Sequence, residues 1–154
     1  MYLDAGFPLG KAQQAGGTYS FAYWHNGECP NLDIGVAENS TKLFLQNNIF
    51  DGPGQCNPDQ RIGLGDAAAL RGGWHRFESH IKWSAGSDGL AEVFDDGRKA
   101  AVLQGRNISR AAPKPNYFKF GIYLHGTQGT ELITPARVYF AGLARSETRE
   151  GLSQ

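Results

Sequence analysis

Residues 116–125 place several reactive side chains at alternate positions. Successive side chains of a β-strand point to opposite faces, so one face of this segment would carry two phenols, an ammonium and an imidazole. These belong to Tyr117, Lys119, Tyr123 and His125. Such groups can exchange protons and hydrogen-bond to a ligand, and Gly121 in the same row would leave room for close approach to the backbone. The alternative is an ordinary exposed strand face in which the glycine marks a bulge.

The other face of this segment is wholly apolar. It is formed by Phe118, Phe120, Ile122 and Leu124. A continuous apolar row on one side of a strand is typical of a surface that packs against a core. We therefore expect this face to cover the core and the polar face to point outward.

A second segment, 18–25, also combines aromatic rings with hydrogen-bonding groups. Alternation would place Tyr19, Phe21, Tyr23 and His25 on one face, and Ser20, Ala22 and Trp24 on the other. Sugar rings stack on aromatic faces and exchange hydrogen bonds at their rims. The two segments together predict a carbohydrate-binding surface on a sheet.

Further segments have the two-residue periodicity of β-strands. They are 32–37, 41–47, 74–83, 90–94, 99–103 and 136–143. The Asp-Gly turn at 96–97 is a strong hairpin signal, and 66–71 is the best helix candidate, with Asp66 as N-cap and Gly72 as stop. Short strands at regular spacing indicate an all-β sandwich or barrel, and we favour a β-sandwich.

Length and composition limit the possible functions. The chain of 154 residues fits a single domain over residues 1–154, or one trimmed at its N-terminus. Fifteen Lys and Arg balance fifteen Asp and Glu, which disfavours a nucleic-acid partner. The apolar runs are too short to span a membrane, so no membrane partner is expected.

Common site motifs are absent from the sequence. His75 and His80 have no zinc-ligand spacing with another His or Cys, and no phosphate-binding glycine loop or nucleophile elbow is present. The alternating charges of segment 74–83 indicate a solvated outer face. We expect neither a metal ion nor a cofactor.

The two cysteines, Cys29 and Cys56, lie in Pro- and Gly-containing stretches that are typical of loops. They allow one disulfide connectivity, which would join two loops and suit a secreted protein; two unpaired thiols are the alternative. The N-terminal residues lack the pattern of a signal peptide. A mature segment would look the same, so we retain a secreted, extracellular location.

Residues 117–123, Tyr-Phe-Lys-Phe-Gly-Ile-Tyr, resemble the Tyr-Phe-Lys-x-Gly-x-Tyr signature of jelly-roll polysaccharide lyases, which include alginate, glucuronan and heparin lyase-like groups. The stretches 74–84 and 92–98 are similar to the run that precedes this signature, and 138–143 resembles the closing strand. The match is best in the C-terminal half of the chain. It implies a concanavalin-like jelly-roll β-sandwich of two antiparallel sheets.

The resemblance also implies roles for individual residues. Tyr123 matches the tyrosine that acts as acid, and often also as base, and Lys119 matches the basic residue on the same face. His25 fits the histidine of the family's Gln-x-His strand, but Tyr23 stands where glutamine is expected.

A lyase of this kind would act on an anionic polysaccharide or oligosaccharide that contains uronic acid. It removes the proton on C5 and expels the sugar linked at O4, so a cation or hydrogen-bond donors must neutralise the adjacent carboxylate. Lys119, Arg61 or Gln46 could do so, in falling order of preference. An ammonium beside Tyr123 would favour release of its proton, and His25 is an alternative base. Tyr117, Tyr23, His125, Gln46 and Arg61 are the expected substrate-binding residues.

Two other functions use the same residues. A carbohydrate-binding module would present the same aromatic face without catalysis. A structural or capsid-type jelly roll would bury the polar face in a subunit contact.

Overall fold

The computed structural model describes residues 1–10, 17–26, 29–49, 58–109, 115–125 and 135–153. The strands are β1 (Tyr2–Leu3), β2 (Thr18–His25), β3 (Pro30–Val36), β4 (Lys42–Asn48), β5 (Pro58–Asp66), β6 (Phe77–Lys82), β7 (Leu90–Asp95), β8 (Arg98–Gln104), β9 (Tyr117–His125) and β10 (Val138–Tyr139). Two short 3₁₀ helices, η2 (Ala67–Leu70) and η3 (Glu150–Ser153), complete the described elements.

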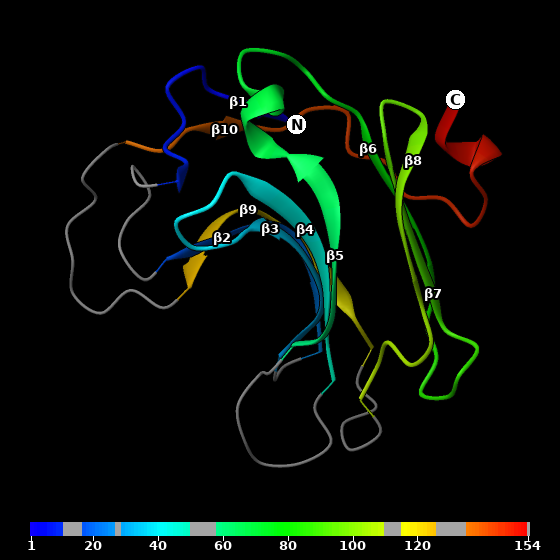
Figure 1. Cartoon of the computed structure of the whole chain (residues 1–154). Coiled ribbons are helices and arrows are strands. Elements are labelled where there is room, and N and C mark those ends of the chain that lie inside the picture. The colour runs from blue at the N-terminus through cyan, green and yellow to red at the C-terminus, as the bar shows by residue number, and fades with distance from the viewer. Residues whose placement is uncertain (11–16, 27–28, 50–57, 110–114, 126–134, 154) are drawn as a thin grey trace.

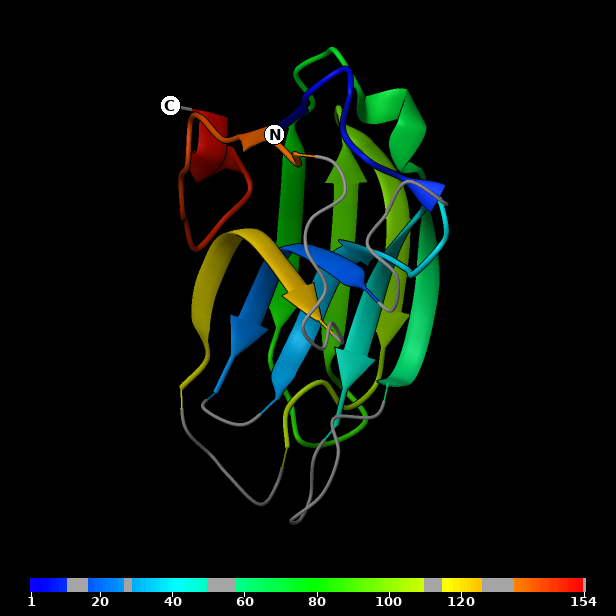
Figure 2. The ribbon, with the colours of Figure 1, turned by 90° about the vertical axis from the view of Figure 1, so that its left-hand side faces the viewer.

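The strands form antiparallel sheets stacked as a sandwich (Figures 1 and 2). The larger sheet has the order β5-β4-β3-β2-β9, the smaller has the order β6-β7-β8, and β1 pairs with β10. Figure 1 shows the five-stranded sheet bent in an arc, with the three-stranded sheet on its outer side. The predicted all-β sandwich of antiparallel sheets is confirmed.

Most predicted strands occur where periodicity placed them, but β5 was missed. Its sequence includes Pro58, Gly63 and Gly65, which are unfavourable in strand interiors. It lies at the edge of the larger sheet, where only one neighbour is needed. The predicted strand 136–143 is also shorter than expected, with only Val138–Tyr139 paired.

Local turn chemistry agrees with the sequence. At the β7–β8 hairpin, Asp96 and Gly97 both have positive φ, 48° and 80°, as a two-residue turn between twisted strands requires. The short helix predicted after Asp66 is the 3₁₀ helix η2, and the Asp66 carboxylate accepts a 3.0 Å hydrogen bond from the amide of Ala68. No helix in the described segments has the length and apolar character needed to cross a membrane.

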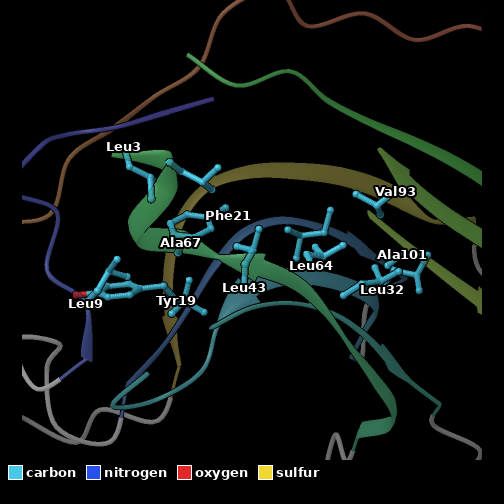
Figure 3. Packing of buried hydrophobic residues seen from close by; sticks show 14 of the residues in the cluster. Leu3, Leu9, Tyr19, Phe21, Leu32, Leu43, Leu64, Ala67, Val93 and Ala101 are labelled. Atoms are coloured by element: carbon cyan, nitrogen blue, oxygen red, sulfur yellow. The ribbon is translucent and has the colours of Figure 1, made fainter. Parts of the chain in front are cut away.

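The core lies between the two sheets (Figure 3). Leu32 and Leu43 from the larger sheet are buried together with Val93 and Ala101 from the smaller one. Alternate residues of β3 and β4 therefore point away from this core, toward the inner side of the arc.

The faces predicted for β2 were wrong in part. Tyr19 and Phe21 are buried in the core, where the ring of Phe7 makes edge contacts with both at 5.1 and 5.6 Å between centroids. The pairing of β2 shifts register between Ser20 and Ala22. A bulge of this kind inserts one residue and reverses the faces that follow. Only Tyr23 and His25 of the predicted row therefore reach the opposite side.

The apolar face predicted for β9 was also wrong in its burial. Phe118, Phe120 and Ile122 are 45%, 46% and 38% exposed, and only Leu124 packs against the core. The smaller sheet has three strands against five, and it contacts the larger sheet where β8 lies against β5. Strand β9 is at the far edge, so the three-stranded layer does not reach it.

Candidate active site

A pocket of about 410 Å³ lies on the inner side of the arc, opposite the core. All five strands of the larger sheet contribute to it. Its lining residues are Thr18, Tyr23, His25, Pro30, Asp33, Gln46, Asn48, Pro58, Arg61, Lys119 and Tyr123. Six of the predicted site residues are thereby brought together although they are spread over about a hundred positions of sequence.

Strand pairing aligns five pocket residues in one row across the sheet. The order is Arg61, Gln46, Asp33, Tyr23 and Lys119, each directly opposite the next. Neighbouring strands are about 4.8 Å apart, so the backbones of Arg61 and Lys119 each lie about 10 Å from that of the aspartate in the middle. The row is cationic at both ends and has a carboxyl group at its centre.

A second row lies beside the first and contains Tyr123. Its neighbour across β2 is Ser20, which lies opposite Gly35. A Cβ atom on Gly35 would come within 2.2 Å of the carbonyl oxygen of Tyr19, because β2 bulges there. The ring of Phe44 would also be only 3.0 Å away, so glycine alone fits this position without displacement of its neighbours.

Aromatic and basic side chains gather at the β2–β9 end of the pocket. The Lys119 Nζ lies 5.5 Å from the ring centroid of Tyr23 and 5.1 Å from that of Tyr117. The Tyr117 hydroxyl is 3.3 Å from the His25 Nδ1, and the rings of Tyr23 and Tyr123 meet edge to face at 5.9 Å. Tyr117 thus supports the pocket residues by contact, while Tyr123 itself is half exposed.

The β4–β5 end is organised by hydrogen bonds. The Arg61 Nε donates to the Gln46 Oε1 at 2.7 Å, and the Gln46 Nε2 donates to the Asn48 Oδ1 at 2.7 Å. The guanidinium also stacks on the ring of Phe44, 4.5 Å from its centroid. These contacts orient the Gln46 amide and hold Arg61 over the pocket, where its other N–H groups can meet an anion.

Asp33 was not predicted as a site residue. It is 3% exposed, and its Oδ2 accepts a 2.8 Å hydrogen bond from the Ser20 hydroxyl. Burial raises the pKa of this carboxyl to about 7, against the opposing effects of the Ser20 hydrogen bond and the Arg61 charge. The sequence did contain one signal for this residue, because Asp33 stands between Leu32 and Ile34 in an apolar strand. A carboxylate is rarely buried in such a strand unless it has a partner or a function.

Two other predicted residues fall at the margin of what the structure describes. His125 pairs with the pocket residue Thr18 in the β2–β9 ladder, but its side chain lies outside the described part. Cys29 is buried and disulfide-bonded, whereas Cys56, its predicted partner, lies outside the described residues. Cys29 directly precedes Pro30, which pairs with His25, so the bond restrains the chain beside the pocket.

One group of described residues has donor atoms close enough for a metal ion, namely His75, Asp95 and Asp96, within 4.8 Å of one another. It lies at the turn between β7 and β8, on the other sheet, and the His75 Nδ1 is already 2.9 Å from a carboxylate oxygen of Asp96. In the pocket, Asp33 is the only carboxylate among the described lining residues. That donor set does not suit a hard cation, which prefers several oxygen ligands.

The antiparallel sandwich agrees with the architecture that the sequence resemblance implied. The chain belongs to the polysaccharide lyase family, since the family model described as "Polysaccharide lyase" matches residues 1–134. The predicted family membership is thereby confirmed.

Among solved structures, the chain is similar to an endo-β-1,4-glucuronan lyase from the fungus Trichoderma reesei, with a TM-score of 0.59 and 18% sequence identity. The match covers 84% of this chain and 58% of the fungal chain, so the present chain spans little more than half the length of that enzyme. At this identity the similarity shows the fold. No curated protein sequence matches the chain.

Proposed function

We propose that this chain cleaves a uronic-acid-containing polysaccharide by β-elimination. The observation that supports the proposal is a single pocket lined by Tyr123, Lys119 and His25 at one end and by Gln46 and Arg61 at the other. The first group can move protons and the second can bind a carboxylate. Both tasks belong to the same reaction.

The first requirement is to make the C5 proton acidic. Removal of this proton shifts negative charge onto the neighbouring carboxylate, so donors aimed at that group lower the barrier. Arg61 can bind the carboxylate through its guanidinium, and its hydrogen bond to Gln46 holds it in place. Lys119 is the alternative cation at the other end of the row.

The second requirement is proton transfer at C5 and O4. A base takes the C5 proton, the electron pair forms the C4–C5 double bond, the C4–O4 bond breaks, and an acid protonates O4 of the leaving sugar. Tyr123 is the proposed acid. The base is either Tyr123 itself or His25. The Tyr117 hydroxyl, 3.3 Å from the His25 Nδ1, positions the imidazole ring.

The test is formation of the unsaturated product, whose conjugated double bond absorbs in the ultraviolet. We expect wild-type protein to release this product from glucuronan or a related uronate polymer. The Tyr123→Phe variant should lose about 100- to 10,000-fold in rate, as removal of a general acid does. Tyr139→Phe is the matched control, because Tyr139 is similarly exposed but belongs to β10, outside the pocket. Folded wild-type protein that gives no product with any uronate polymer would refute the proposal.

A second candidate is a carbohydrate-binding module without turnover. The observation that favours it is the set of aromatic rings at one end of the pocket, Tyr23, Tyr117 and Tyr123, which suit stacking of sugar rings. Such a module would retain polymer binding in both wild type and Tyr123→Phe and would release no unsaturated product.

We further propose that the protein acts outside the cell. The disulfide bond at Cys29 supports this, because such bonds persist in oxidising compartments. Detection of the native protein in culture medium rather than in the cell lysate would test it.

A further inference from the structure

We propose that Asp33 makes the pocket take up a proton when an anionic sugar binds. The inference rests on the proposed function for the class of ligand, a uronate. It concerns binding, however, and does not require turnover. Asp33 acts here as a positioning and specificity-determining group, since its charge controls how well the pocket accepts a second negative charge.

The geometry that leads to this inference is the row across the sheet. Asp33 occupies the middle strand, with Gln46 on one side and Tyr23 on the other. Both neighbours are uncharged, and the cations Arg61 and Lys119 are each two strands away. A carboxylate ligand that binds either cation therefore lies within about 10 Å of Asp33.

The surroundings of Asp33 stabilise a charge poorly. Its Oδ1 is buried with no hydrogen-bond partner among the described residues, and its Oδ2 accepts a hydrogen bond from the Ser20 hydroxyl. No described cation is within ion-pair distance of it, and the burial that raises its pKa to about 7 outweighs the distant charge of Arg61. The carboxyl is therefore close to half ionised near neutral pH before any ligand arrives.

A bound uronate changes this balance. Two unit charges about 10 Å apart repel each other, at an effective dielectric constant of about 20, enough to change a proton affinity about tenfold. Binding of the anion therefore favours the protonated form of Asp33. By linkage, a rise in pH that removes this proton weakens binding of the anion by the same factor, about tenfold.

Other groups that face Asp33 must be separated from this effect. They are His25 and Tyr23 from β2, Arg61 from β5, and Lys119 and Tyr123 from β9, whereas β4 contributes the amides of Gln46 and Asn48. Of these types, histidine is the one that ordinarily titrates close to neutrality, and a protonated His25 would also favour an anion. An Asp33→Asn variant keeps His25 and removes only the carboxyl. Asparagine has nearly the shape of protonated aspartate, so the variant mimics the uncharged state at every pH.

The experiment is calorimetric titration of a short glucuronate oligosaccharide into Tyr123→Phe, which suppresses cleavage, with and without Asp33→Asn. Titrations at about pH 7.5 in buffers of different ionisation enthalpy report the protons taken up. We expect uptake of about half a proton with Asp33 present and markedly less in the Asp33→Asn variant. We also expect the Asn variant to bind about tenfold tighter than its parent at about pH 9.

The outcomes separate this inference from the lyase proposal. Equal proton uptake with and without Asp33, or no binding of the oligosaccharide to either protein, overturns the inference. Proton-linked binding without product formation by wild type sustains it while refuting the lyase reaction. If Asp33→Asn does not fold, titration of the Asp33 carboxyl carbon resonance in the protein with an intact Asp33 replaces the variant. A titration midpoint near pH 7 that rises on adding the oligosaccharide sustains the inference. A titration midpoint below about pH 5 overturns it.

Discussion

Strands β4 and β9 both direct a row of alternate apolar side chains to the same side of the larger sheet, yet these rows have different surroundings. Leu43 and Leu45 of β4 are 2% and 1% exposed, whereas Phe120 and Ile122 of β9 are largely open. The three-stranded sheet lies behind the central strands, and the first part of β9 lies beyond its edge (Figure 2). Alternation therefore identifies which side chains share a face, and the opposing layer determines whether that face is buried.

The opposite face of the sheet differs between centre and edge as well. At the centre, Asp33 of β3 and Gln46 of β4 are buried although they are polar. At the β9 edge, Lys119 and Tyr123 are exposed. The pocket thus combines a hydrogen-bonded floor with a phenol and an ammonium at an open margin.

The largest difference should come from truncating one aliphatic side chain in each apolar row. Leu45→Ala leaves a cavity in the core and should lower the free energy of unfolding by about 2–5 kcal/mol. Ile122→Ala should lower it by less than about 1 kcal/mol, because much of this side chain already contacts water. Denaturant unfolding of the two variants measures both values. Equal losses would show that the β9 row is buried after all.

A smaller effect is expected from the tight packing at the centre of the sheet. Gly35→Ala places a methyl group against the Tyr19 carbonyl and should cost about 1–3 kcal/mol of stability, with distortion of the pocket floor. Gly63→Ala is the matched control, since Gly63 also lies opposite Phe44 but has no atom within 4 Å of the new methyl group. Thermal or denaturant unfolding compares the two, and a Gly35→Ala variant as stable as the control would contradict the proposed close approach.

The buried carboxyl at the centre predicts a pH dependence of stability that the exposed margin lacks. The raised pKa means that folded protein retains the Asp33 proton up to about pH 7, whereas an unfolded aspartate releases it near its ordinary pKa of 3.8. Between these values the unfolded state binds fewer protons, so this group's contribution to stability is greatest below about pH 4 and is lost as the pH rises to about 7. The loss is at most about 1.4 kcal/mol per pH unit.

Measurement of unfolding free energies at several pH values, in wild type and Asp33→Asn, isolates this contribution because the other groups are common to both. Wild type should lose stability relative to the variant from about pH 4 to about pH 7, and the difference should then level off. A difference that is constant over this range would mean that Asp33 is ionised in the folded protein throughout.

The smallest effect on stability is expected from a polar substitution in the open row. Phe120→Thr introduces a β-branched residue that, like phenylalanine, favours strands, and it removes an exposed aromatic ring next to Phe118 and Phe140. We expect a change of less than about 1 kcal/mol in unfolding free energy, but weaker binding of an apolar fluorescent dye. Unchanged dye binding would show that the row is not the accessible apolar surface.

Much of the fold could be predicted because its signals are local. The periodicity of 18–25 and the Asp-Gly turn at 96–97 depend on neighbouring residues only, and both elements occur where they were expected. Strand β5 was missed because its Pro and Gly residues obscure the pattern, although pairing with β4 holds it in place. The bulge at Phe21 could not be predicted either, because one unpaired residue leaves no mark on local strand propensity. It nevertheless reverses the faces of the residues that follow it.

The candidate site divides in the same way. Tyr123 and Lys119 could be found from their spacing and from the resemblance, and Gln46 from its place in a strand expected to run beside the groove. Asp33 could not, because its importance depends on burial and on the distance to cations from strands far away in the sequence.

By itself, then, the sequence determined most of the strands, the hairpin, the signature of a polysaccharide lyase and a set of groups that can move protons. These follow from short-range sterics and from side-chain chemistry, which neighbouring residues are sufficient to specify. The tertiary structure alone decided which rows are covered, where a bulge separates the face of Tyr19 and Phe21 from that of Tyr23 and His25, and that a buried aspartate lies between two cations. Burial and long-range electrostatics depend on which layers meet and how far apart they lie, and strand pairing sets those distances only when the whole sheet has formed.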